Sequence, residues 1–195
     1  MVKYFNEKEH DLLNKVILVL GSQGSGKTVL INELIEKIKN DLPKDYNSCI
    51  VRDYDKTVIK GFIDQQIKNI RNPEIKDPRS LLVVDGVNND WIGQNEFRFL
   101  FVNGRSAKIT FVMSCQDPVT LPPQLRANVD YIFICDQTYK DSIFNNYGLF
   151  ENKQQFDNAI DQYTKDYNVA VIKNTIHFNN LDDIVFTYKA SPELI

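Results

Sequence analysis

The segment at residues 21–28 reads GSQGSGKT and joins two stretches of opposite character. Before it, residues 15–20 form a short apolar run rich in β-branched side chains, which is typical of a strand buried on both faces. After it, apolar residues recur at three- and four-residue steps as far as Asn40, which predicts an amphipathic helix of about four turns. A buried strand that enters a helix through a glycine-rich turn predicts an α/β fold.

The same alternation continues along the chain. Further strands are expected at residues 48–52, 81–84, 108–115, 130–135, 168–173 and 183–189, and further helices at 57–70, 95–102, 139–147 and 154–167. Strands that alternate with helices imply right-handed βαβ units and a mostly parallel sheet between helical layers. No repeat or linker divides the sequence, so we expect a single domain over residues 1–195, with its core at 15–190 and an N-terminal extension at about 1–14.

Charge and cysteine content narrow the class of protein. Lys and Arg number 23 and Asp and Glu number 26, and the net charge of −3 excludes a general basic coat for nucleic acid while permitting local contact with phosphates. Three widely spaced cysteines indicate a reducing compartment, and with only two histidines they match no recognised zinc spacing. No apolar run approaches the ~18 residues of a membrane span, so we expect a soluble intracellular protein.

The glycine-rich segment matches the phosphate-loop pattern G-x-x-x-x-G-K-[ST]. Its glycines permit positive φ angles and leave no Cβ between the backbone amides and a phosphate, so successive N–H groups can converge on an anion at the positive end of the helix. The expected phosphate-binding residues are Gly21, Ser22, Gln23, Gly24, Ser25, Gly26, Lys27 and Thr28. Lys27 would add a positive charge for the β- and γ-phosphates, and the Thr28 hydroxyl could ligate Mg²⁺. A chance Gly-Lys-Thr in an ordinary turn is the alternative.

A carboxylate for the metal ion is expected at Asp85, which ends the apolar run at 81–84. Ligands gather at the carboxyl ends of parallel strands, so Asp85 should lie near Thr28 and share the magnesium site with it. The next residue is Gly86, where many ATPases carry a second acid that polarises the attacking water. Either Asp90 or Glu96 takes that place through a folded-back loop, or hydrolysis is slow; the sequence leaves both readings open.

A second pattern runs from residue 101 to 136 and includes NGR at 103–105, ITFVMSCQ at 109–116 and LPPQLRANVDYIF at 121–133. It resembles the genome-packaging ATPases of poxviruses and giant DNA viruses, in the FtsK–HerA branch of P-loop ATPases. In that family an arginine precedes the fourth strand, a glutamine ends it, and a proline-arginine-asparagine loop leads into the fifth. The resemblance covers roughly residues 16–189 and implies a P-loop NTPase of the RecA/FtsK-like type, a three-layer sandwich. Gly86 and Ser106 depart from it, where the family usually has an acid and often a histidine.

The resemblance assigns roles to three further residues. It places the fourth strand between the phosphate-loop strand and the Asp85 strand, so that Gln116 lies beside the γ-phosphate and can orient water. Arg105 is the implied arginine finger for a neighbouring subunit's site, because its fork of donors matches phosphate oxygens, and Arg126 is its rival. The implied catalytic set is Lys27, Asp85, Gln116, Arg105 and Arg126. An exposed strand-end glutamine and ordinary surface arginines are the alternatives.

The resemblance further implies a function and its partners. It implies an ATPase that hydrolyses ATP with Mg²⁺ to translocate double-stranded viral DNA, without sequence preference, into a capsid. A homo-oligomeric ring, a pentamer or a hexamer, would contact a capsid or portal-vertex protein in the viral factory of the host cytoplasm, or in the virion. The candidates for DNA contact are Lys60, Lys68, Arg71, Lys76, Arg79 and Trp91, with a solvated face and a packing tryptophan as the plainer reading.

Two other functions stay open. A small phosphotransferase such as a nucleotide kinase shares the loop and the size, although no arginine-rich lid is visible. A nucleotide-gated assembly module with weak hydrolysis would suit the missing acid at Gly86. A GTPase is disfavoured, because residues 85–88 do not fit D-x-x-G and no N-K-x-D segment occurs.

Overall fold

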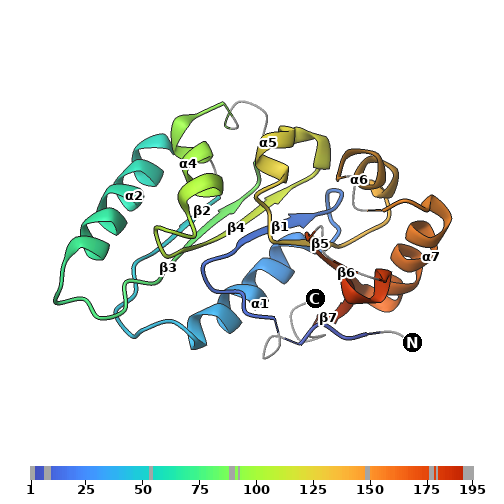
Figure 1. Cartoon of the computed structure of the whole chain (residues 1–195), viewed down its shortest axis with the longest axis horizontal. Helices are drawn as coiled ribbons and strands as arrows, with labels where there is room; N and C mark the ends of the chain where they lie inside the picture. Colours follow the sequence, from blue (N-terminus) through green and yellow to red (C-terminus); the bar gives the residue numbers. More distant parts are fainter. Residues whose placement is uncertain are drawn as a thin grey trace.

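Seven strands form one mixed sheet in the order β2-β3-β4-β1-β5-β6-β7 (Figure 1). The computed structural model describes residues 3–6, 10–52, 55–87, 91, 93–147, 150–175, 178 and 180–190. The strands are β1 Val16–Leu20, β2 Ser48–Val51, β3 Ser80–Asp85, β4 Ile109–Cys115, β5 Tyr131–Ile134, β6 Asn168–Lys173 and β7 Val185–Lys189. The first five are parallel, whereas β6 runs antiparallel to both β5 and β7. β1, which leads into the phosphate loop, therefore lies in the middle of the sheet.

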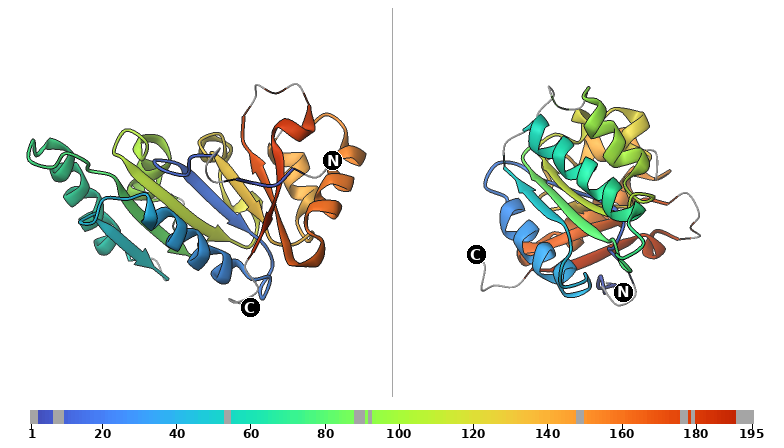
Figure 2. Two further views of the ribbon diagram at one scale, coloured as in Figure 1. Left: turned by 90° about the horizontal axis from the view of Figure 1, so that it is seen from below. Right: turned by 90° about the vertical axis from the view of Figure 1, so that its left-hand side faces the viewer.

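Helices cover both faces of this sheet, unevenly (Figure 2). They are α1 Lys27–Asn40, α2 Lys56–Arg71, α4 Asn95–Asn103, α5 Pro123–Arg126, α6 Lys140–Tyr147 and α7 Lys153–Tyr163, with 3-10 turns η1 Pro118–Thr120, η2 Lys165–Tyr167 and η3 Leu181–Asp183. α1 packs on one face, and the other helices pack on the opposite face. The arrangement confirms the predicted three-layer α/β class.

The alternation of side chains along β1 explains the two cores. Val16, Leu18 and Leu20 join the cluster that contains residues of α2, α4, α6 and α7. Ile17 and Val19 join the cluster that contains the apolar face of α1. Every residue of β1 is buried, as expected for a central parallel strand, so the phosphate loop begins from a rigid support.

The described part of the N-terminal segment is packed against the sheet. Phe5 donates its N–H to the Thr187 carbonyl, and Thr187 donates to the carbonyl of Lys3, both at 2.8 Å. The Phe5 ring meets Phe133 edge-on with 5.5 Å between centroids. The segment thereby covers the outer edge of β7, which would otherwise present unpaired backbone groups.

Two features differ from the sequence-based expectations. The helix expected at 154–167 ends at Tyr163, because Asp166 adopts a left-handed conformation with φ of 55° in the following turn. α5 and the 3-10 turns were not expected. The three cysteines are free thiols. Among the described residues, no helix is both long and apolar enough to cross a membrane.

Candidate nucleotide site

The glycine-rich loop links the end of β1 to the start of α1. Gly24 and Gly26 have φ of 79° and 87°, the left-handed conformations that their residue type predicts. Gly21 has a different reason: a Cβ there would collide with the Ser25 hydroxyl, which is packed under the loop. The glycines therefore serve both the path of the backbone and its close packing.

The start of α1 is open to an anion. No side chain caps its N-terminus, and no acidic residue stands in its first turn. The unpaired N–H groups of a fourteen-residue helix thus face the loop with the positive end of the helix dipole. The Lys27 ammonium donates to the carbonyls of Gly21 and Ser22 at 2.8 and 2.7 Å, so a full positive charge lies at the same place.

Asp85 is held by hydroxyl groups from two other elements. Thr28 Oγ1 donates to Asp85 Oδ2 at 2.9 Å, and Ser114 Oγ donates to Oδ1 at 2.6 Å. Ser114 also accepts the N–H of Gly86 at 2.8 Å and is fully buried in β4. The hydroxyl and carboxylate oxygens of Thr28 and Asp85 are ligands of the kind that Mg²⁺ prefers, so the pair fits the expected metal ion. Ser114 was missed; its signal is a polar residue within an apolar strand.

Gln116 follows β4 directly and is exposed. β4 pairs with β1 on one side and β3 on the other, which is the strand position that the resemblance implied. A cleft of about 460 Å³ at the carboxyl ends of these strands is lined by Lys27, Asp85, Gly86, Gln116 and Asp117. The structure thus brings the loop lysine, the strand-end aspartate and the strand-end glutamine together at one cleft.

Gly86 has φ of 97°, a conformation that residues with a side chain rarely adopt. A glutamate at this position would be strained in the observed backbone. Glu96 does not line the cleft, and its side chain is 14% exposed and lies 3.9 Å from the Lys56 ammonium. Asp90 lies outside the described residues.

Asp136 is a second loop anchor that the sequence analysis missed. Its Oδ2 accepts both the N–H and the hydroxyl of Ser22, at 2.6 and 2.7 Å, and its Oδ1 accepts the N–H of Thr138 at 2.8 Å. Burial opposes ionisation of Asp136, but the hydrogen bonds from Ser22 and Thr138 outweigh it and lower the pKa of the carboxyl group. The carboxylate therefore ties the first half of the loop to the end of β5.

A hollow of about 370 Å³ opens on that side of the loop. Its walls include Gly24 and Val29 from the loop and α1, Asp136 and Cys135 after β5, and Val169 of β6. Burial raises the pKa of the Cys135 thiol to about 12, so this cysteine is a neutral wall of the hollow.

Arg105 lies at the amino-terminal end of β4, in the turn before this strand and at the other end of the sheet from the cleft. Its Nε donates to Asp130 Oδ2 at 3.1 Å, and its Nη2 donates to the Asn128 carbonyl at 3.1 Å and forms an ion pair with Asp130 Oδ1 at 3.0 Å. Its side chain is 48% exposed. The seven residues of β4 span roughly 20 Å at about 3.3 Å per residue, and they separate Arg105 from Gln116. Arg105 therefore does not line the cleft of its own chain.

Arg126 lies on α5 and is only 8% exposed. Its guanidinium lies over the Tyr147 ring, 5.5 Å from the centroid, and its Nε and Nη1 are buried without a hydrogen bond to the described residues. The structure brings Arg126 neither to the cleft nor to an exposed position, which argues against a role as a finger.

Three of the six candidate DNA-contact residues lie on α2. Lys60, Lys68 and Arg71 are exposed on this helix, whereas Arg79 is paired with Asp77. Trp91 is 9% exposed and belongs to the core, in agreement with the packing role.

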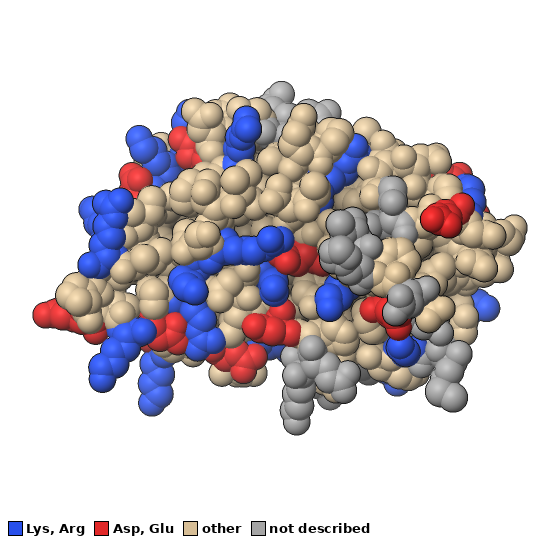
Figure 3. Space-filling model, in the orientation of Figure 1, with Lys and Arg blue, Asp and Glu red and all other residues tan. Residues whose placement is uncertain are grey.

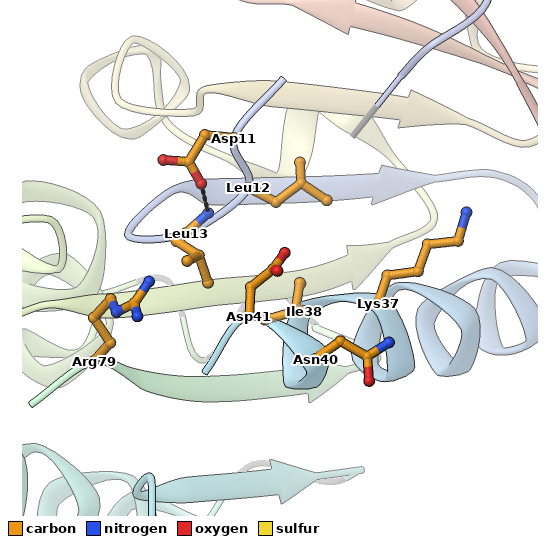
Figure 4. A pocket seen from close by; sticks show the side chains of 8 residues that line it. All are labelled: Asp11, Leu12, Leu13, Lys37, Ile38, Asn40, Asp41 and Arg79. Atoms are coloured by element: carbon orange, nitrogen blue, oxygen red, sulfur yellow. Dashed lines mark hydrogen bonds between the residues drawn. The ribbon is translucent and has the colours of Figure 1, made fainter. Parts of the chain in front are cut away.

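Another hollow, of about 540 Å³, lies where β1 and β3 begin (Figure 4). Asp11, Asp41, Lys37 and Arg79 line it together with apolar residues. It does not include the phosphate loop, and its mixed charges offer no site for a polyphosphate.

The sequence is similar to those of several viral proteins. No known family profile matches the sequence. The chain is 32% identical over 121 residues to an uncharacterized protein of Acanthamoeba polyphaga mimivirus, covering 58% of this chain and 43% of that protein. It is 27% identical over 207 residues to an uncharacterized protein of Frog virus 3, covering 92% of this chain and 63% of that protein. The chain thus spans between about two fifths and two thirds of the length of these relatives.

Solved structures share the fold over most of the chain. The genome packaging NTPase B204 from Sulfolobus turreted icosahedral virus 2, in complex with AMPPCP, superposes with a TM-score of 0.63 at 13% identity, covering 91% of this chain and 98% of that one. The cytoplasmic domain of the Thermomonospora curvata type VII secretion ATPase EccC gives 0.60 at 14% identity, covering 89% of this chain and 25% of that one. The predicted resemblance is confirmed: the chain has the P-loop ATPase fold of viral genome-packaging NTPases, and its relatives in sequence are viral proteins.

Proposed function

We propose that this protein is a motor ATPase that hydrolyses ATP with Mg²⁺ and translocates double-stranded DNA into a viral capsid. One observation carries the proposal. Lys27, Asp85 and Gln116 line one cleft at the carboxyl ends of the strands, and Thr28 donates a hydrogen bond to Asp85 there. The fold around this cleft is that of genome-packaging NTPases.

The triphosphate would bind along the loop. Its β- and γ-phosphates would accept hydrogen bonds from the backbone N–H groups at the start of α1. The Lys27 ammonium, which donates to the carbonyls of Gly21 and Ser22 in this structure, would donate to these phosphates instead. Thr28 and Asp85 would hold Mg²⁺, which neutralises charge on the phosphates. Gln116 would orient the attacking water. The nucleoside would occupy the hollow beside Val29 and Val169, whose apolar side chains suit a purine ring.

The position of Arg105 supports the proposed oligomeric ring. Its guanidinium is half-exposed beyond the amino-terminal end of β4, far from its own cleft, so as a finger it would serve the site of another subunit. A contact that joins one side of a subunit to the opposite side of the next is heterologous, and such contacts form a ring when the rotation between subunits closes. A pentamer or a hexamer is the proposed assembly, with Arg105 as the finger at each interface.

Local positive charge supports contact with DNA. Lys60, Lys68 and Arg71 lie along α2, with Asp64 among them. Figure 3 shows Lys and Arg gathered over the half of the molecule that carries α2, with acidic residues interspersed. A ring repeats this surface in every subunit, so a chain of net charge −3 can still bind phosphates without reading sequence. The relatives are viral proteins, and the proposed second partner is a capsid or portal-vertex protein, in the viral factory of the host cytoplasm or in the virion.

The test is hydrolysis of ATP by the assembled protein, with and without double-stranded DNA. The proposal expects release of phosphate that DNA stimulates, and no transfer to added nucleoside monophosphates. Transfer of a phosphoryl group from ATP to the added nucleoside monophosphates would instead favour a nucleotide kinase. Bound ATP that stays intact in a single-turnover experiment with DNA would favour a nucleotide-gated assembly module, the reading that Gly86 supports.

A further inference from the structure

The cleft contains a carboxylate to which no role has been given. Asp117 is exposed and lines the cleft together with Lys27, Asp85 and Gln116. We propose that Asp117 is the general base for ATP hydrolysis and replaces the acid that is absent at Gly86. The proposal rests on the proposed ATPase function of the same cleft.

Asp117 is fixed in position from three sides. Its Oδ1 accepts the N–H of Val119 at 2.9 Å and thereby caps η1. The Cys115 thiol donates to its carbonyl at 3.4 Å. Pro118 follows and is buried, which restricts the backbone on both sides of the peptide bond. A general base must hold its geometry, and these contacts supply it.

One oxygen of Asp117 remains available. Oδ2 makes no hydrogen bond to the described residues, whereas Oδ1 is engaged in the cap. The charges of Asp117 and Lys27 both act on Cys115 at the end of β4. Burial raises the pKa of that thiol to about 12, Asp117 adds to the rise, and Lys27 opposes it. The free oxygen therefore belongs to the same electrostatic environment as the lysine that would hold the γ-phosphate.

The other described carboxylates near the loop are already engaged. Both oxygens of Asp85 accept hydrogen bonds, one from the Ser114 hydroxyl and one from the Thr28 hydroxyl. Asp136 accepts hydrogen bonds on both oxygens and lines the hollow on the other side of the loop. Asp117 is thus the described acid in the cleft with an oxygen free to take a proton.

In the proposed step, Asp117 Oδ2 takes a proton from water as the water oxygen forms a bond to the γ-phosphorus. The bond between that phosphorus and the β,γ-bridging oxygen breaks, and ADP leaves with the electron pair. Asp117 then returns the proton to solvent. Gln116, the neighbouring residue, would hold the same water in line.

The substitution Asp117→Asn separates the proposed role of this side chain as a general base from its role as the cap of η1. An asparagine Oδ1 can still accept the Val119 N–H, so η1 is retained while the proton acceptor is lost. Asp55→Asn is the matched control, because Asp55 caps α2 in the same way and does not line the cleft. The experiment measures single-turnover cleavage of Mg·ATP with double-stranded DNA, ATP affinity and melting temperature for both variants and the wild type.

We expect Asp117→Asn to slow cleavage by about 10²–10⁴-fold, the usual contribution of a general base, with ATP affinity unchanged or slightly tighter because one negative charge is gone. Asp55→Asn should cleave ATP as fast as the wild type. Equal cleavage rates in the wild type and Asp117→Asn would overturn the role of Asp117 and leave the ATPase function standing. A wild type that binds ATP but never cleaves it would overturn both.

Discussion

Ser114 in β4 donates a 2.6 Å hydrogen bond to Oδ1 of Asp85 at the end of β3. The same hydroxyl accepts the N–H of Gly86, so one buried side chain fixes both the carboxylate and the turn that follows it. Ser114 lies on β4, two residues before Gln116, which directly follows this strand. The proposed metal ligand and the proposed water-orienting glutamine are therefore held by the same strand.

Ser114→Ala should weaken both the fold and the metal site. The substitution leaves Asp85 Oδ1 and the Gly86 N–H without their partner, which should lower the free energy of unfolding by about 1–3 kcal/mol. Loss of a group that orients a metal ligand typically costs about 10–100-fold in metal affinity, so ATP binding should need more Mg²⁺. Urea denaturation and a Mg²⁺ titration of ATP binding measure the two effects.

Ser80→Ala is the control for this variant. Ser80 is also fully buried, on β3, but among the described residues its hydroxyl donates only to the Lys108 carbonyl, at 3.3 Å, at the other end of the strand. It should change stability and leave the Mg²⁺ requirement as it is. A Ser114 variant with the Mg²⁺ dependence of the wild type would show that Asp85 does not need this hydrogen bond.

Asp136 predicts a particular dependence of stability on pH. Burial opposes the charged form, but the hydrogen bonds from Ser22 and Thr138 prevail and lower its pKa in the folded state below the ordinary 3.8. The unfolded chain therefore binds this proton at higher pH than the folded one, so the stabilisation is complete above pH 3.8 and is lost as pH falls through the lowered value.

Asp136→Asn should accordingly melt at a lower temperature than the wild type at neutral pH. The gap in melting temperature should narrow as pH falls below about 4, where the wild-type carboxylate also takes up a proton. Ser22→Ala, which removes one of the two hydrogen bonds from that residue, should show a smaller gap of the same shape. A gap that stays constant down to pH 3 would mean that the charge of Asp136 does not stabilise the loop.

Gln116→Ala should separate binding of ATP from its cleavage. Gln116 is exposed beside the cleft and makes no hydrogen bond to the described residues, so its removal should leave the fold and ATP affinity nearly intact. Hydrolysis stimulated by DNA should be lost, because the side chain is proposed to orient the attacking water. Steady-state phosphate release with DNA measures this, and equal rates in variant and wild type would refute the role.

Most of the fold could be predicted because long elements leave a strong periodic signal. The apolar runs at 15–20 and 108–115 correspond to β1 and β4 within one residue at each end. α5 has four residues in a proline-rich connection, too short to show a period. The antiparallel direction of β6 depends on where the chain re-enters the sheet, which no local pattern records.

The residues of the candidate site also divide into those that a local sequence pattern predicts and those that it does not. Phosphate-loop residues and Asp85 follow patterns within single segments, and their meeting follows from the parallel sheet. Asp117 and Asp136 come two residues after β4 and β5, so the signal used for Asp85 could have found them. The burial of Arg126 against Tyr147 could not be predicted, because it joins residues from two helices that share no sequence pattern.

In the proposed ring, the loop of one subunit binds ATP and Arg105 of the next subunit completes its cleavage. Mixing two inactive variants tests it directly: Lys27→Ala lacks the loop ammonium but keeps the finger, and Arg105→Ala has the reverse. Each variant alone should be inactive, and Arg105→Ala should still bind ATP. In an equal mixture about one quarter of the interfaces join an intact loop to an intact finger, so DNA-stimulated hydrolysis should return to roughly that fraction of the wild-type rate. A mixture as inactive as its components, in rings shown to contain both variants, would contradict the claim.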